Sequence, residues 1–217
     1  MTQRENFVSL LKRRGYEAMP VTLSLCPVLR DKFEAYLREH PMEVNYSYAN
    51  LRGLDWEIAS PEQFLREYYP DKRFKEGTTV NGWGVVNEPG SAAAFHMMRF
   101  YHPMESFDSV EQIEAYPFPR FLPESLARMK REAEALHAKG LAVVGDMQCT
   151  VWETAWSMRG MENLLCDMME DSPMATVLLD KVTERAVMRA KAFTEAKMPT
   201  LSSGPPILSP PLVPLLT

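Results

Sequence analysis

The chain has 217 residues, of which 46% are hydrophobic and 24% are charged, and its formal net charge is -5. This composition is typical of a globular domain with its own core, and without a basic block we expect no nucleic-acid partner. No apolar run approaches the length of a membrane span, so we expect no membrane partner. The cysteines Cys26, Cys149 and Cys166 have no paired spacing, which favours a reducing, cytoplasmic setting.

The first third of the chain is predicted to alternate helix and strand. Residues 5–14 place apolar side chains on one helical face, residues 21–25 form a short strand, and residues 28–39 form a second helix. Arg30 lies in the first turn of that helix, where it is either a solvated charge or a cation that binds substrate. The less regular region 42–77 is expected to be a peripheral insertion.

Residues 78–88 alternate in hydrophobicity and are predicted to form a strand that contains Trp83. Glu88 comes at its end. A carboxylate just after a strand is a candidate catalytic group, and the alternative is a charge at the edge of a hairpin. His102 is a candidate for the mouth of a binding pocket. It has no second ligand at metal-binding spacing, so no metal site is predicted.

The second half of the chain has the clearest pattern. A helix over 124–138 leads into a strand over 141–145, whose continuous apolar run is typical of a parallel strand with both faces covered. Helices then follow over 151–159, with Thr150 as the expected cap, from 161 onward, and over 174–196. The second of them is expected to bury four residues: Leu164, Leu165, Met168 and Met169.

The loop and helix after the strand carry three further candidate site residues. Because loops at the carboxyl ends of parallel strands converge, polar groups there are candidates for chemistry. Glu153 is a candidate catalytic carboxylate, and Arg159 a candidate substrate-binding cation. Each would be costly to bury unpaired, so it is solvated, paired with an opposite charge, or in contact with a ligand. Trp156 either binds substrate or belongs to the core.

Several short motifs follow one another along the chain in a recognisable order. They are Trp83-Gly84-Val85-Val86, Tyr101-His102-Pro103-Met104, Tyr116-Pro117-Phe118-Pro119, Ala142-Val143-Val144-Gly145, Thr150, Trp156 and Arg159-Gly160-Met161-Glu162-Asn163-Leu164. In this order they resemble the uroporphyrinogen decarboxylase superfamily, particularly its methylcobalamin-type methyltransferases and its uncharacterised branches. The likeness covers most of residues 1–197.

This resemblance implies an α/β fold, a (β/α)8 TIM barrel, with a ligand that is a tetrapyrrole, a corrinoid protein or a small methyl donor or acceptor. A complete barrel typically needs about 250 residues. We therefore expect a barrel truncated to roughly its N-terminal half. Its open sheet edges would be covered by another chain, for example in a homodimer, or by the C-terminal tail.

The resemblance also assigns roles to residues. Decarboxylases of this superfamily grip the substrate's carboxylates with arginines after the first strand, where only Arg30 could substitute, and Glu88 is the analogue of the aspartate that faces the pyrrole nitrogens. Methyltransferases use zinc, with ligands from the C-terminal half. Hence we expect no cofactor within this chain, with zinc and a corrinoid partner belonging to a full-length member. The methyltransferase-like function is preferred, and the alternatives are uroporphyrinogen III decarboxylase of porphyrin biosynthesis and an inactive half-barrel or binding module.

Two regions follow from this interpretation: a partial barrel domain over 1–197 and a tail over 198–217. The tail has six prolines in twenty residues and no charge. The alternation of helices and strands in a barrel nevertheless requires a strand there. We therefore expect a frame-shifted tail that forms no central strand. The alternative is a true proline-rich terminus.

Overall fold

The computed structural model describes residues 1–19, 25–41, 48–51, 55–90, 97–147, 149–198 and 200–201. Its helices are α1 (Gln3–Leu11), α2 (Pro27–Glu39), α3 (Pro61–Tyr68), α4 (Val110–Glu114), α5 (Pro123–Ala138), α6 (Trp152–Arg159), α7 (Met161–Met169) and α8 (Pro173–Glu195). Its strands are β1 (Tyr48–Leu51), β2 (Trp56–Glu57), β3 (Thr79–Val80), β4 (Val86–Pro89), β5 (Met98–Tyr101), β6 (Arg120–Phe121), β7 (Ala142–Asp146) and β8 (Thr200–Leu201).

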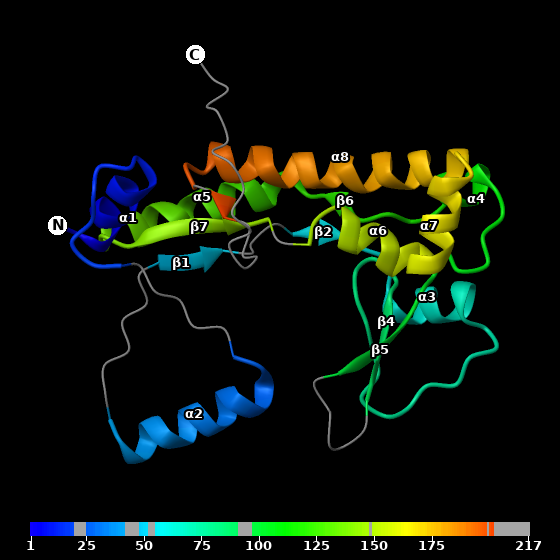
Figure 1. The fold of residues 1–217 in the computed structure, drawn as a ribbon, viewed down its shortest axis with the longest axis horizontal. Coiled ribbons are helices and arrows are strands. Elements are labelled where there is room, and N and C mark those ends of the chain that lie inside the picture. The colour runs from blue at the N-terminus through cyan, green and yellow to red at the C-terminus, as the bar shows by residue number, and fades with distance from the viewer. Residues whose placement is uncertain are drawn as a thin grey trace.

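The strand β7 is the centre of a parallel sheet, with β1 paired to one side of it and β8 to the other (Figure 1). Val143 packs with α5 and α8 on one face, whereas Ala142 and Val144 pack with Phe7 of α1 on the other. The continuous apolar run of β7 is explained by this burial on both faces. The prediction of a covered parallel strand here is confirmed.

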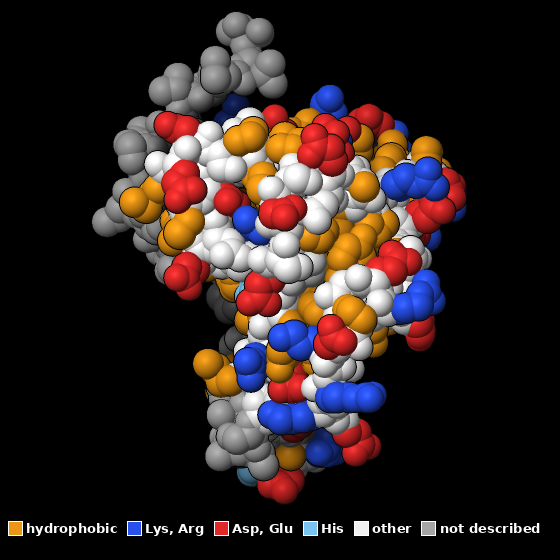
Figure 2. Space-filling model, turned by 90° about the vertical axis from the view of Figure 1, so that its right-hand side faces the viewer, with side chains coloured by type: hydrophobic (Ala, Val, Ile, Leu, Met, Phe, Trp, Pro, Cys, Tyr) orange, Lys and Arg blue, Asp and Glu red, His pale blue; other side chains and the backbone are white. Residues whose placement is uncertain are grey.

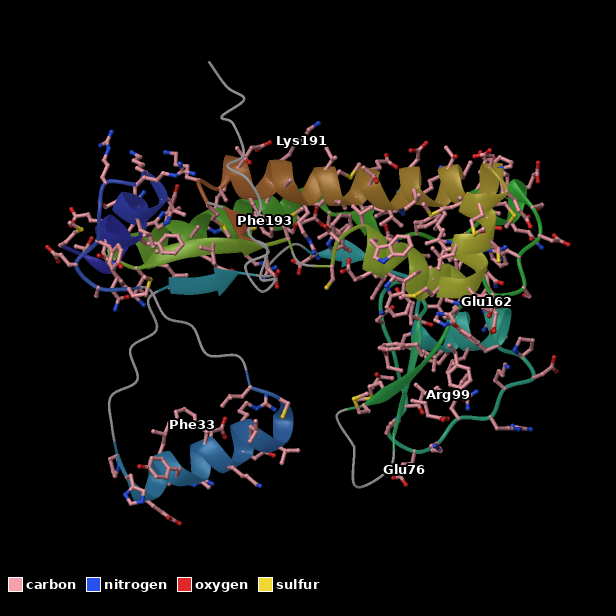
Figure 3. The ribbon with its side chains drawn as sticks, in the orientation of Figure 1. Phe33, Glu76, Arg99, Glu162, Lys191 and Phe193 are labelled. Atoms are coloured by element: carbon pink, nitrogen blue, oxygen red, sulfur yellow. The ribbon has the colours of Figure 1, made fainter. Side chains whose placement is uncertain are left out.

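The helix α8 precedes β8 in the chain, and it packs along this sheet. Phe193 of α8 is fully buried and lies between the helix and β7 (Figure 3). A side chain at Gly145 of β7 would collide with the ring of Phe193. Glycine therefore permits the close approach of α8 to the strand, and it fixes where along β7 the helix lies.

A second group of elements packs beneath α6 and α7 (Figure 1). The strands β3, β4 and β5 form an antiparallel sheet, and α3 lies beside it. The core here is an aromatic and methionine cluster that includes Phe64, Met104, Tyr116 and Met158. The short antiparallel pair of β2 and β6 adds a further link, in which Trp56 pairs with Phe121.

Two predictions about strands were wrong. Residues 78–88 form two antiparallel strands, β3 and β4, and Trp83 lies in the turn between them. The side chain of Asn81 accepts hydrogen bonds from the amides of Trp83 and Val85, at 2.9 and 3.1 Å, and so forms this turn. The region 42–77 is not a peripheral insertion, since β1 pairs with the central strand β7.

The helices of the second half begin and end close to the predicted residues, but two details differ. Thr150 does not cap α6, because its hydroxyl donates to the carbonyl of Met147 and Val151 occupies the cap position. In α7, Leu164 is buried as predicted, whereas Leu165, Met168 and Met169 are exposed. One face of this short helix is enough to contact α6 and α8.

The described sheets are small and none of them closes, so the truncated barrel stays a prediction. The tail 198–217 was expected to form no central strand, and Thr200 and Leu201 form an edge strand of the described sheet, paired in parallel with Gly145 and Asp146. The rest of the tail, 202–217, lies outside the described residues, as do residues 21–24 of the predicted first strand. No described helix has the length and apolar composition that a membrane span requires.

Replacing Gly145 by alanine tests the contact between α8 and β7. The new methyl group collides with the buried ring of Phe193, and overpacking of this kind lowers the free energy of unfolding by about 2 kcal/mol. Denaturant unfolding of Gly145→Ala against wild type measures the loss. Gly82→Ala, whose nearest neighbour is the exposed side chain of Ile58, is the matched control, and its change stays within about 0.5 kcal/mol. Equal losses in both variants would contradict the proposed role of Gly145.

Candidate functional site

A cavity of about 270 Å³ opens beyond the carboxyl end of β7. Residues from β2, the β3–β4 turn, the loop after β7, α6 and α8 line it. The lining residues are Trp56, Ile58, Gly82, Trp83, Pro119, Cys149, Thr150, Thr154, Arg185, Ala186 and Arg189. Its place follows the general tendency of α/β folds to bind ligands outside the carboxyl ends of their strands.

Two arginines of α8, Arg185 and Arg189, form the cationic side of this cavity. Arg185 donates to the carbonyl of Pro119 at 3.1 Å and to the carbonyl of Lys181 and a carboxylate oxygen of Glu184, at 2.8 and 3.0 Å. Burial lowers the pKa of both guanidinium groups, since the charged form loses water, and for Arg185 the charge of Glu184 partly opposes this. An anion in the cavity would offset that loss of hydration.

Asp146 adds a second negative charge near the cationic side, after that of Glu184. It is the last residue of β7, and its carboxylate raises the pKa of Arg189 against the larger effect of burial. The guanidinium of Arg189 is half-buried and faces a carboxylate of the chain as well as the cavity. A ligand anion would therefore share Arg189 with Asp146.

Two tryptophans form the aromatic walls of the cavity. Trp56 comes from β2, where it packs edge-on against Phe121. Trp83 is held in the β3–β4 turn, where its carbonyl accepts a hydrogen bond of 2.7 Å from the hydroxyl of Tyr116. Tryptophan rings give a flat apolar ligand a large contact area.

The loop between β7 and α6 completes the lining with small polar groups. Cys149 adopts a backbone φ of 55°, and the hydroxyl of Thr154 donates to its carbonyl at 3.0 Å. Burial, followed by the charges of Glu153 and Asp146, raises the pKa of the Cys149 thiol. The thiol is therefore protonated at neutral pH and is a weak nucleophile.

Among the seven residues predicted for the site, the structure places Trp83 in the lining of this cavity. Glu153 is exposed on the first turn of α6, beside the lining residue Thr154. Its charge reaches the cavity through its effect on Cys149. Arg30 is exposed on α2, a helix whose described side chains are all partly or fully exposed.

Arg159 is buried and belongs to a structural clamp. Its Nε and Nη2 donate to both carboxylate oxygens of Asp167, at 2.8 and 3.2 Å. Its Nη1 donates to the carbonyls of Met104 and Phe107, each at 2.8 Å. The clamp thus joins α6, α7 and the loop after β5, and it leaves Arg159 paired with an opposite charge, one of the three alternatives that the sequence left open.

His102 and Trp156 belong to the same junction. The Nδ1 of His102 lies 2.7 Å from the carbonyl of Ser157, so this ring nitrogen carries the proton and donates it. Trp156 packs edge-on against Phe100 and His102 and lies against the core cluster beneath α6. Both residues hold the loop after β5 against α6.

Glu88 is buried in the antiparallel sheet, apart from the lining of the cavity. Burial raises the pKa of its carboxyl, but the amide and the ammonium of Lys75 and the hydroxyl of Tyr101 outweigh that effect and hold it below the ordinary value. Its strand β4 pairs with β5 as a hairpin. Glu88 thus lies within a hairpin, but it is buried and paired in the middle strand of the sheet and is not a charge at a hairpin edge.

Sequence reasoning missed the two arginines, although a signal was present. Leu178, Val182, Arg185, Arg189 and Phe193 follow one another at intervals of four, three, four and four residues, so they share one face of α8. The apolar residues of that face belong to the core. Two cations in an otherwise buried stripe indicate either a buried ion pair or an anion site.

No family model, curated protein or solved structure matches the chain. Within the described part of the chain, no group of three or more His, Cys, Asp or Glu side chains is placed to hold a metal ion. The described residues therefore offer no ligand set that fits the zinc that the sequence resemblance attributes to full-length methyltransferases.

Removal of Asp167 tests the clamp. In Asp167→Ala the guanidinium of Arg159 stays buried without its partner, which lowers the free energy of unfolding by about 3 kcal/mol. Thermal or urea unfolding measures the loss, and Asp180→Ala, an exposed acid on α8, is the control. The double variant Arg159→Met, Asp167→Leu recovers part of the stability, since no charge is then left buried. A loss in Asp167→Ala no larger than in the control would contradict the clamp.

The low pKa of Glu88 predicts a dependence of stability on pH. A carboxyl whose folded-state pKa lies below its ordinary value of 4.5 stabilises the fold above that pH, and it loses this effect as the pH falls through the folded-state pKa. The free energy of unfolding of wild type is therefore higher than that of Glu88→Gln at neutral pH. This difference in stability becomes smaller as the pH falls into the acid range. Unfolding midpoints across an acid pH series measure it. Glu34→Gln, on exposed α2, shows no such convergence if the assignment is correct.

Proposed function

We propose that the chain binds a small molecule with an anionic group and a flat apolar part in the cavity at the end of β7. One observation carries the proposal: two half-buried arginines and two tryptophans from separate elements line the same cavity. Arg185 and Arg189 would bind a carboxylate or a phosphate, since guanidinium groups match both geometries. Trp56 and Trp83 would pack against the apolar part.

The size of the cavity favours the methyltransferase-like function. Its volume of about 270 Å³ lies below the range of roughly 300–1,000 Å³ that is typical of pockets for drug-sized ligands. A whole tetrapyrrole macrocycle is larger than such a space, whereas a small methyl donor or acceptor fits. We therefore propose that the chain takes part in corrinoid-linked methyl transfer and binds the small partner of that reaction, with the corrinoid on another protein.

Arg185 and Arg189 also support a second candidate function, decarboxylation of a pyrrole acetate. Such a reaction requires cations for the substrate's carboxylates, and the sequence offered only Arg30 for that role. The α8 pair supplies two cations at the end of a strand instead. In this case a single pyrrole side chain would enter the cavity while the rest of the macrocycle stayed outside.

Tryptophan fluorescence tests the binding of anions, because Trp56 and Trp83 line the cavity. Benzoate and phenyl phosphate are the anionic probes, and benzamide is the uncharged one. We expect the anions to quench the emission and benzamide to bind at least about tenfold more weakly, since it lacks the charge-assisted bonds. The substitution Arg189→Met weakens the binding of both anions by about tenfold or more. Arg131→Met, which removes an exposed arginine of α5, leaves them unchanged.

Activity measurements separate the two candidate reactions. Transfer of a labelled methyl group between methylcobalamin and a small thiol supports the first, and release of carbon dioxide from uroporphyrinogen supports the second. Either activity must fall in Arg189→Met and persist in Arg131→Met. Equal quenching of the Arg189→Met protein and of wild type by benzoate would overturn the proposed site.

A further inference from the structure

The end of the molecule formed by α4, α7 and the start of α8 is acidic. The segments 103–119 and 160–180 contain no lysine or arginine. They meet in space, because Asn163 donates to the carbonyl of Glu105 at 3.0 Å and α4 and α7 both contact α8. Their exposed acids are Glu105, Asp108, Glu111, Glu114, Glu162, Glu170, Asp171 and Asp180. Figure 2 views this end and shows hydrophobic side chains between acidic ones.

An exposed apolar stripe runs along α7 at this end. Met161, Leu165, Met168 and Met169 are 45%, 43%, 45% and 85% exposed, and their spacing places them on one helical face. Other positions of α7 face the rest of the fold, since Leu164 is fully buried and Asp167 binds Arg159. The stripe is therefore not needed for the packing of α7 itself.

Charged side chains border this stripe. Glu162 projects from α7 (Figure 3), and Glu170 follows the end of the helix. We call the four apolar residues together with Glu162 and Glu170 the α7 surface. Methionine side chains are flexible and polarisable and adapt to varied apolar partners, while the acids attract cations.

We propose that the α7 surface binds a basic amphipathic helix of another protein. The apolar face of such a helix would cover the methionines and Leu165, and its lysines or arginines would face the acidic end of the molecule. The nine residues of α7 expose a stripe about two to three turns long, which matches a short helical segment. This inference does not depend on the function proposed for the cavity.

Charge argues against the two other occupants of such a stripe. A symmetric pair of this chain would place the same acids opposite one another, which is unfavourable. The exposed helix α2 of a second copy carries three basic and three acidic residues, and so offers no complementary charge. Anionic lipid headgroups would be repelled by the acids.

Fluorescence anisotropy of a labelled synthetic peptide tests the proposal on the full chain. The probe is a helical peptide of leucine and lysine with its leucines on one face, and the same peptide with glutamate for lysine is its charge-reversed control. We expect the lysine peptide to bind with a Kd of about micromolar order, more weakly as salt rises, and the glutamate peptide not to bind.

Variants then locate the binding on the α7 surface. The double substitution Leu165→Ser, Met168→Ser weakens binding of the lysine peptide by about tenfold or more. In contrast, Met188→Ser, which changes an exposed methionine of α8, leaves the affinity for the peptide unchanged. The pair Glu162→Gln, Glu170→Gln weakens binding and reduces its salt dependence, unlike Glu34→Gln, Glu39→Gln on α2. Both serine changes lie at exposed positions, and circular dichroism verifies that the fold is kept.

Three results would overturn the inference. One is equal affinity of the lysine peptide for the serine pair and for wild type. Another is binding of wild type, but not of the serine pair, to phosphatidylserine vesicles, which would make the stripe a membrane contact. The third is a dimer on size-exclusion chromatography that the serine pair dissociates, which would make the occupant a second copy of the chain.

Discussion

The contact of Phe193 with Gly145 sets the position of α8 against β7, and the candidate site depends on that position. Only a residue without a side chain lets the ring lie on the strand at this point. Arg189 and Arg185 precede Phe193 by four and eight residues on the same helical face, so they lie about one and two turns along α8 from the contact with Gly145. The cavity lies past the end of the sheet of β7, where α8 extends beyond the strand.

The elements with strong local signals could be predicted from the sequence. The helix α5 begins at Pro123 and its residues Met129 and Ala133 repeat at helical spacing, which placed it within a residue of its observed start. The strand β7 was recognised from its continuous apolar run. In contrast, β1 owes its place to pairing with a strand more than ninety residues later, and no local pattern reveals such a partner.

The site was harder to predict because local chemistry does not show which charges meet. Arg159 and Asp167 are separated by a helix junction at Gly160, where φ is 86°, so helical spacing could not pair them. The arginines of α8 were missed for a different reason. They lie within an apolar stripe, and the pattern of that stripe is typical of a core. The sequence predicted Trp83 in a strand, whereas the structure has a turn there that Asn81 forms. Trp83 nevertheless lines the cavity.

The charged residues differ between the beginning and the later turns of the helix α8. Its first turns adjoin the acidic end that includes Asp171 and Asp180, while its later turns present Arg185 and Arg189 to the cavity. Charges of opposite sign therefore lie at different places along this helix. For the proposed anionic ligand, these charges would disfavour approach to the acidic end and favour approach to the arginines, and dissolved salt would weaken this effect. For the proposed basic helix the same charges would have the opposite effect, so the two proposed ligands would bind at separate parts of the surface.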